Sequence, residues 1–135
     1  MNITTSEAKG RVPITILHLQ GDLDGQSYQE LIKEARRLYD DGARDFILDL
    51  SGVMFMSSAG LVGLHIVSML SRGEALPDVE QGWATMKTMG RSRGGKQEHV
   101  KLLSPQPPVR NVINMVGFDQ AFDIFDDQTA AVNSF

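Results

Sequence analysis

Residues 14–50 decide the fold, and they read ITILHLQGDLDGQSYQELIKEARRLYDDGARDFILDL. The segment 14–19 is rich in β-forming residues and carries apolar side chains on both of its faces, which is typical of a strand covered on both sides. A helical stripe of apolar residues follows, formed by Tyr28, Leu31, Ala35 and Leu38. Residues 46–50 then form a second short apolar strand. A strand, a helix and another strand predict a right-handed crossover between two parallel strands, so the fold class is α/β.

The ends of this helix carry recognisable signals. Ser27 and Glu30 have the spacing of a capping box, in which each side chain satisfies the free backbone amide of the other residue. Gly42 has the position of a left-handed terminator. We therefore predict a helix over residues 28–41, after a strand over residues 11–20.

The remaining segments extend the same architecture in both directions. A strand over residues 2–7 and a turn at Lys9 and Gly10 form a hairpin with the strand at 11–20. Beyond residue 50 the pattern predicts a helix over 59–72, a strand over 100–103, a helix from Pro107 that ends before Gly117, a strand over 121–125 and a frayed or helical tail over 129–135. The chain is thus expected to form a sheet with helices packed on it.

Composition narrows the functional classes. The chain has 135 residues, the size of a single domain, so we expect one domain over residues 1–135. It has no cysteine, no apolar run long enough to cross a membrane and no signal pattern at its N-terminus. Thirteen basic against 17 acidic residues leave a net charge of −4, which offers no electrostatic footprint for nucleic acid. We expect a cytoplasmic protein with no nucleic-acid or membrane partner.

One stretch fits none of these elements. Residues 73–98 are rich in glycine and contain the only tryptophan, Trp83, so we predict an atypical long loop there. The second half of the loop is locally basic, through Lys87, Arg91, Arg93 and Lys96. Both a solvated, mobile loop and a binding patch are compatible with this charge. Trp83 either anchors a partner or folds back onto its own domain.

Polar residues follow the two central strands where each strand ends. Asp22 and Asp24 come after the first of these strands, and Ser57 and Ser58 come after the second. Parallel strands joined by a right-handed crossover end at the same edge of the sheet. We therefore expect the two acidic residues to lie near the two serines.

Either serine can cap the helix that begins beside it, and such a cap stabilises a helix by about 1 kcal/mol. The free amides and the dipole at a helix start also attract anions, so a phosphate on a serine here does not need to unfold the helix. A phosphate would add about −1.5 to −2 charges beside Asp22 and Asp24 and would oppose a partner that must desolvate this edge. The pattern favours a reversible phosphorylation switch at Ser57 or Ser58.

Three motifs, in this order and with these elements between them, resemble the STAS domain, the module named for sulfate transporters and anti-sigma factor antagonists. They are GDLD at 21–24, LDLSGV at 48–53 with FMSSAGL at 55–61, and the segment from Ser104 and Pro105 through Val109 to MVGF at 115–118. The chain is most similar to the stand-alone bacterial antagonists, and the similarity covers nearly everything except residues 73–98.

The resemblance implies a mixed sheet of about five strands with helices packed on it, and a regulatory function. Such a protein binds an anti-sigma factor that has serine kinase activity, and binding releases the sigma factor. The kinase then phosphorylates the antagonist and ends the interaction, and a metal-dependent serine phosphatase restores it. For the antagonist itself we expect no catalytic residue, no cofactor and no resident metal.

The resemblance also carries over to single residues. The family's phosphoacceptor lies two residues before the Gly-Leu pair that opens the helix, which is Ser58 here. Ser57 stands where many members carry an aspartate, and it remains a rival acceptor. Asp24 matches the family's aspartate in the facing loop, which orients the acceptor or its partner contacts. The residues expected to bind the partner are Asp22, Asp24, Ser57, Ser58, Gly60 and Leu61.

Two alternatives belong to other functional classes. A STAS-like scaffold that docks in a larger signalling assembly without a covalent switch fits the same residues. A serine hydrolase needs a base within reach of its serine, yet the Gly-x-Ser-x-Gly elbow is absent and His65 lies roughly 10 Å along the helix from Ser58. His18 and His99 are interpreted as core or surface residues.

Overall fold

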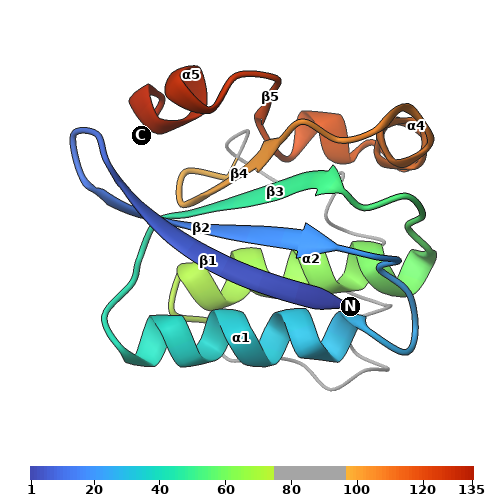
Figure 1. Cartoon of the computed structure of the whole chain (residues 1–135), viewed down its shortest axis with the longest axis horizontal. Helices are drawn as coiled ribbons and strands as arrows, with labels where there is room; N and C mark the ends of the chain where they lie inside the picture. The colour runs from blue at the N-terminus through green and yellow to red at the C-terminus, as the bar shows by residue number, and fades with distance from the viewer. Residues whose placement is uncertain (75–96) are drawn as a thin grey trace.

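The computed structural model describes residues 1–74 and 97–135. Most of the long loop predicted for residues 73–98, with Trp83 and its basic second half, therefore lies outside the described residues. The described chain forms a five-stranded sheet in the order β1-β2-β3-β4-β5 (Figure 1). The prediction of a mixed α/β sheet of about five strands with helices packed on it is confirmed.

The sheet begins with a hairpin and continues with parallel strands. β1 (Asn2–Lys9) pairs antiparallel with β2 (Pro13–Gln20), and the Gly10 amide closes the turn on the Val12 carbonyl at 3.2 Å. β3 (Phe46–Gly52), β4 (Val100–Leu103) and β5 (Ile124–Phe125) then follow in parallel. The two parallel central strands expected from the crossover pattern are β2 and β3.

The helices of the described residues lie mostly close to their predicted ranges. Those between parallel strands are α1 (Tyr28–Asp40), α2 (Ser58–Ser71), α4 (Pro107–Met115) and the short 3₁₀ helix η1 (Phe118–Gln120), and α5 (Gln128–Asn133) follows the last strand. Gly42, with φ of +111°, and Gly117, with φ of +80°, adopt the left-handed backbone that ends α1 and α4, so both predicted stop signals are confirmed.

Two local predictions are wrong. Ser27 precedes α1, but its backbone is helical and its side chain makes no capping hydrogen bond, because the hydroxyl turns back into the preceding loop. The strand predicted over residues 121–125 shrinks to Ile124–Phe125. Ala121 and Phe122 lie instead in a bend after η1 that is buried in the core, which accounts for their apolar side chains. The ring centroids of Phe122 and Phe118 are 5.8 Å apart.

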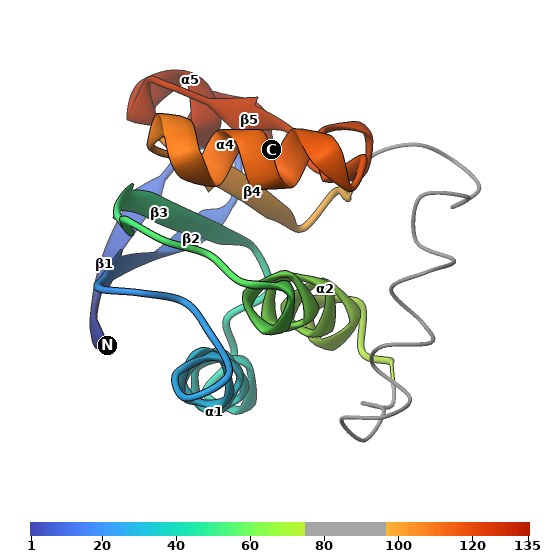
Figure 2. The same ribbon diagram turned by 90° about the vertical axis from the view of Figure 1, so that its right-hand side faces the viewer.

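Helices cover both faces of the sheet. The main core joins the inner face of the sheet to α1, α2 and α4, with Leu31, Leu64 and Ile113 among its fully buried members. A smaller core on the opposite face joins Ile16 and Ile47 to α5. Figure 2 shows α1 and α2 on one side of the strands and α5 on the other. Because α5 is short, it covers Ile14 and Ile16 of β2 but leaves His18 and Gln20, nearer the carboxyl end of that strand, more exposed.

Candidate functional site

The loops that follow β2 and β3 lie side by side at the carboxyl edge of the sheet. Three backbone hydrogen bonds join them: Gly21 N–H to the Gly52 carbonyl at 3.0 Å, Leu23 N–H to the Phe55 carbonyl at 2.9 Å, and Ser57 N–H to the Leu23 carbonyl at 3.0 Å. Leu23 and Met56 form an isolated parallel bridge. The structure thus brings together the two loops that the sequence places at one edge.

Gly60 allows the first loop to pass directly over the start of α2. A Cβ atom at this position would overlap the Leu23 carbonyl oxygen and would lie 2.8 Å from Cγ of Met56. The Leu23 carbonyl is the same group that accepts the Ser57 amide. Gly60 and the neighbouring Leu61 are buried, so they support the site from below rather than offering a free surface.

Asp24 and Ser27 hold the first loop in shape. The Asp24 carboxylate accepts the Gln26 amide at 3.0 Å and the Ser27 hydroxyl at 3.3 Å. The Ser27 hydroxyl also donates to the Asp22 carbonyl at 2.7 Å and accepts the Asp24 amide at 3.0 Å. The Asp24 carboxylate therefore orders its own loop, whereas the Asp22 side chain is exposed at the edge. Sequence reasoning assigned Ser27 to the helix cap and missed this second role.

The two serines at the start of α2 differ in what their hydroxyls do. Ser57 has extended backbone, and its hydroxyl accepts the Gly60 amide at 3.4 Å as the N-cap of α2. Ser58 is the first residue of the helix and is exposed. Within the described part of the chain, the Ser58 hydroxyl has no hydrogen-bond partner. Ser58 is thus the more accessible of the two hydroxyls.

Two large apolar side chains are exposed at this edge, and sequence reasoning missed their exposure. Met54 is 62% exposed and Phe55 is 52% exposed, and both lie in the loop that leads to Ser57. Met115 and Val116 at the end of α4 are also exposed, and α4 runs across the same end of the molecule (Figure 2). No local signal separates Met54 and Phe55 from their neighbours, because Val53 and Met56 are apolar residues of the same loop and are buried.

Among the residues that the structure describes, neither serine has a basic hydrogen-bond partner. His65 lies in α2 and is buried, and neither of its ring nitrogens has a hydrogen-bond partner in this part of the chain. Burial lowers the pKa of His65, and the Arg72 cation lowers this pKa further, so the ring is neutral. His99 binds Asp45 at 2.8 Å instead. Among residues 1–74 and 97–135, no cluster of potential ligands could hold a metal ion.

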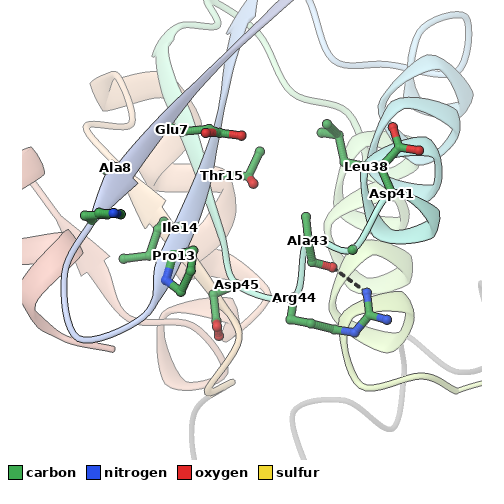
Figure 3. A pocket seen from close by; sticks show the side chains of 12 residues that line it. Glu7, Ala8, Pro13, Ile14, Thr15, Leu38, Asp41, Ala43, Arg44 and Asp45 are labelled. Atoms are coloured by element: carbon green, nitrogen blue, oxygen red, sulfur yellow. Dashed lines mark hydrogen bonds between the residues drawn. The ribbon is translucent and has the colours of Figure 1, made fainter.

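A cavity of about 790 Å³ lies at the other end of the sheet, between the β1–β2 hairpin and the loop after α1 (Figure 3). Its lining carries acidic residues such as Glu7 and Asp45 and the basic Arg44. The Arg44 guanidinium donates to the Tyr39 and Ala43 carbonyls, at 2.8 Å each, and stacks on the Tyr39 ring at 3.9 Å. Arg44 therefore closes the loop, and the cavity stays remote from both serines.

A family model described as the STAS domain matches residues 5–72, just over half of the chain. The chain belongs to the STAS domain family. The matched residues of this STAS chain include both loops of the candidate site and the whole of α2. No curated protein sequence matches it. In the described parts of the chain, no helix is long and apolar enough to cross a membrane.

Solved structures of anti-sigma factor antagonists share the fold of the STAS chain. A putative antagonist from Thermotoga maritima superposes with a TM-score of 0.68 at 17% identity, over 96% of this chain and 90% of the other. An antagonist from Mycobacterium paratuberculosis gives 0.65 at 18% identity, over 98% and 93%. The phosphorylated form of the Bacillus cell fate determinant SpoIIAA gives 0.54 at 15% identity, over 98% and 97%. At these identities the likeness establishes the fold.

Proposed function

We propose that this STAS chain is an anti-sigma factor antagonist that acts in the cytoplasm as one module. It binds an anti-sigma factor with serine kinase activity through the edge formed by Asp22, Asp24, Ser57 and Ser58, which the buried Gly60 and Leu61 support from below. The kinase ends the interaction by phosphorylating Ser58, and a serine phosphatase restores it. The observation that carries the proposal is an exposed, unbonded Ser58 hydroxyl on the first residue of α2, beside the loop that presents Asp22.

The surroundings of Ser58 support both states of the proposed switch. Exposed Met54 and Phe55 offer apolar area that a partner can bury. The free amides at the start of α2 tolerate a phosphate on Ser58, so the fold survives the modification. The added charge would lie beside the like charges of Asp22 and Asp24, so this edge would cost more free energy to desolvate when a partner binds. Turning 99% binding into 1% binding needs about 5.5 kcal/mol of differential interaction, and a phosphate without a counter-ion in a desolvated interface supplies a large part of it.

The test uses the chain as bait in an extract of the source organism with ATP. We expect a captured serine kinase and one added phosphate, and peptide mapping should place it on Ser58. Ser58→Ala should keep the captured kinase bound in the presence of ATP. Calorimetric titration with the purified kinase should give a dissociation constant at least about tenfold weaker for Ser58→Asp.

Two controls separate the switch from its alternatives. Thr129→Asp adds the same charge on exposed α5, on the opposite face of the sheet, and should leave the affinity unchanged. A phosphate on Ser57 would move the switch by one residue. Stable partner binding without any phosphate, together with equal affinities of wild type and Ser58→Asp, would instead identify a non-switching scaffold.

A further inference from the structure

A second constellation lies on the open half of the face that α5 covers only in part. Ser6 of β1, His18 of β2 and Asp49 of β3 come from three adjacent strands (Figure 1). The Ser6 Oγ lies 2.8 Å from Nε2 of His18, and Nδ1 of His18 lies 2.7 Å from Oδ2 of Asp49. The three side chains therefore form one continuous hydrogen-bonded row.

Strand register produces this row. His18 lies directly opposite Asp49 in the parallel β2–β3 ladder, and Ser6 lies diagonally across the hairpin, opposite Ile16. Side chains two residues apart on a strand share a face. Ile16 and Ile47 belong to the core under α5, so His18 and Asp49 stand on that face just beyond the helix. Ser6 is exposed, the side chains of His18 and Asp49 are 31% and 16% accessible, and the row is separate from Ser57 and Ser58.

The protonation of the row follows from its acceptors. Burial raises the pKa of Asp49, but hydrogen bonds from His18 and from the Ser51 amide, at 3.0 Å, outweigh burial and lower this pKa. An ionised carboxylate only accepts hydrogen bonds, so His18 carries its hydrogen on Nδ1. In the neutral form of the ring, Nε2 then has a free lone pair that can accept the Ser6 hydroxyl. This is the arrangement of nucleophile, base and orienting carboxylate that raises the reactivity of a serine.

We propose that Ser6, His18 and Asp49 form a chemically reactive row in which Ser6 accepts an acyl group from an activated acyl donor. The Ser6 oxygen attacks the carbonyl carbon of the donor, and an ester bond forms while the bond to the leaving group breaks. The Ser6 proton passes to Nε2 of His18 and from there to the leaving group. Asp49 is a positioning residue, because it acts on Ser6 only through His18.

The surroundings of Ser6 define the class of donor. Ser6 is exposed, and the His18 side chain is 31% accessible, so a small donor can approach both. β1 is the edge strand of the described sheet, so its outer side is open to a donor. The described residues supply Ser6 with a base and an orienting carboxylate, but with no ordered group of oxyanion donors. We therefore expect reaction with donors that have a good leaving group, such as aryl esters and acyl phosphates, rather than with amides.

The experiment incubates the full chain with p-nitrophenyl acetate and, separately, with acetyl phosphate. We expect intact mass spectrometry to show one acetyl group with p-nitrophenyl acetate, and peptide mapping to place it on Ser6. Ser6→Ala should lose this modification. Thr5→Ala, which removes the neighbouring exposed hydroxyl on the other face of β1, should still be labelled at Ser6. His18→Gln and Asp49→Asn should slow acetylation at Ser6 by at least about tenfold. Acetylation with acetyl phosphate identifies a cellular class of donor, whereas reaction with the aryl ester alone restricts the proposal to aryl esters.

A structural role for the row would give a different result. The pH profile of acetylation in the wild type should follow one ionisation, and Asp49→Asn should shift its midpoint, which a purely structural hydrogen bond would not do. The proposal is overturned if Ser6 reacts no faster than Ser51 or Ser58, or if His18→Gln reacts like the wild type. Ser6 is exposed, so a thermal melt should confirm that Ser6→Ala folds normally and that its loss of labelling reports chemistry.

Discussion

At the scale of single residues, Gly60 decides whether the two site loops can meet. We expect Gly60→Ala to destabilise the protein by about 1–3 kcal/mol, because its methyl group would overlap the Leu23 carbonyl and crowd Met56. Helix propensity alone would stabilise this variant, since alanine in a helix is about 1 kcal/mol more favourable than glycine, so a net loss of stability reports the steric overlap. Urea unfolding measures the difference in the free energy of unfolding.

Gly25→Ala is the matched control for this substitution. Gly25 lies in the same loop region, and a Cβ atom there would meet nothing within 4 Å. We expect its effect to stay within about 0.5 kcal/mol. Equal unfolding midpoints for the Gly60 and Gly25 variants would show that the loop moves aside without cost, and Gly60 would lose its role in positioning the site.

At the scale of elements, α2 buries one ionisable side chain, His65, that makes no hydrogen bond within the described chain. His65 is buried with both ring nitrogens unpartnered, and burial and Arg72 lower its pKa while Glu74 raises it. The ring is therefore neutral in the folded protein, whereas in the unfolded chain it takes up a proton as the pH falls below about 6.5. Since the unfolded state then binds more protons, the stability due to this residue is present above that pH and is lost below it.

His65→Leu should remove this pH dependence. We expect the variant to lose less stability than the wild type between pH 7.5 and pH 5, and to be about 1 kcal/mol or more stable at neutral pH because no unpaired polar group stays buried. Urea unfolding at both pH values measures the two differences. Parallel stability curves for the two proteins would mean that His65 finds a partner or water in solution.

The elements themselves were predictable where the signal is local. The apolar stripe of α1 and the left-handed Gly42 depend on neighbouring residues only, so sequence reasoning placed both. The predicted cap at Ser27 was wrong because the Ser27 hydroxyl donates to a loop carbonyl, that of Asp22, instead of capping the helix. The predicted strand at Phe122 was wrong because a buried bend and a buried strand both favour an apolar residue, so the sequence does not distinguish them.

At the scale of the whole molecule, the sites depend on how distant strands align. Sequence order predicts that the loops after β2 and β3 share an edge. It does not predict that the Leu23 amide donates to the Phe55 carbonyl or that the Ser57 amide donates to the Leu23 carbonyl, because both bonds follow from the register of the two loops. The row of Ser6, His18 and Asp49 is harder still to foresee. A shift of one residue in β1 would turn Ser6 to the other face, and nothing local to Ser6 indicates its partners.

The smaller core also depends on contacts between distant parts of the chain, because it forms where the C-terminal helix α5 packs on the sheet. Val132 is buried there, and a Cβ atom at Gly10 would lie 2.8 Å from its carbonyl oxygen, so the last helix is seated directly on the hairpin. We expect Val132→Asp to displace α5 from the sheet and to lower the free energy of unfolding by about 2 kcal/mol or more, because it buries an unpaired charge.

Asn133→Asp is the matched control, since it adds the same charge to an exposed position of the same helix and should cost no more than about 0.5 kcal/mol. Urea unfolding gives both values, and binding of an apolar dye should rise only for Val132→Asp as Ile16 and Ile47 become exposed. Similar unfolding midpoints for the two variants would mean that α5 contributes little to stability and that the sheet tolerates an open second face.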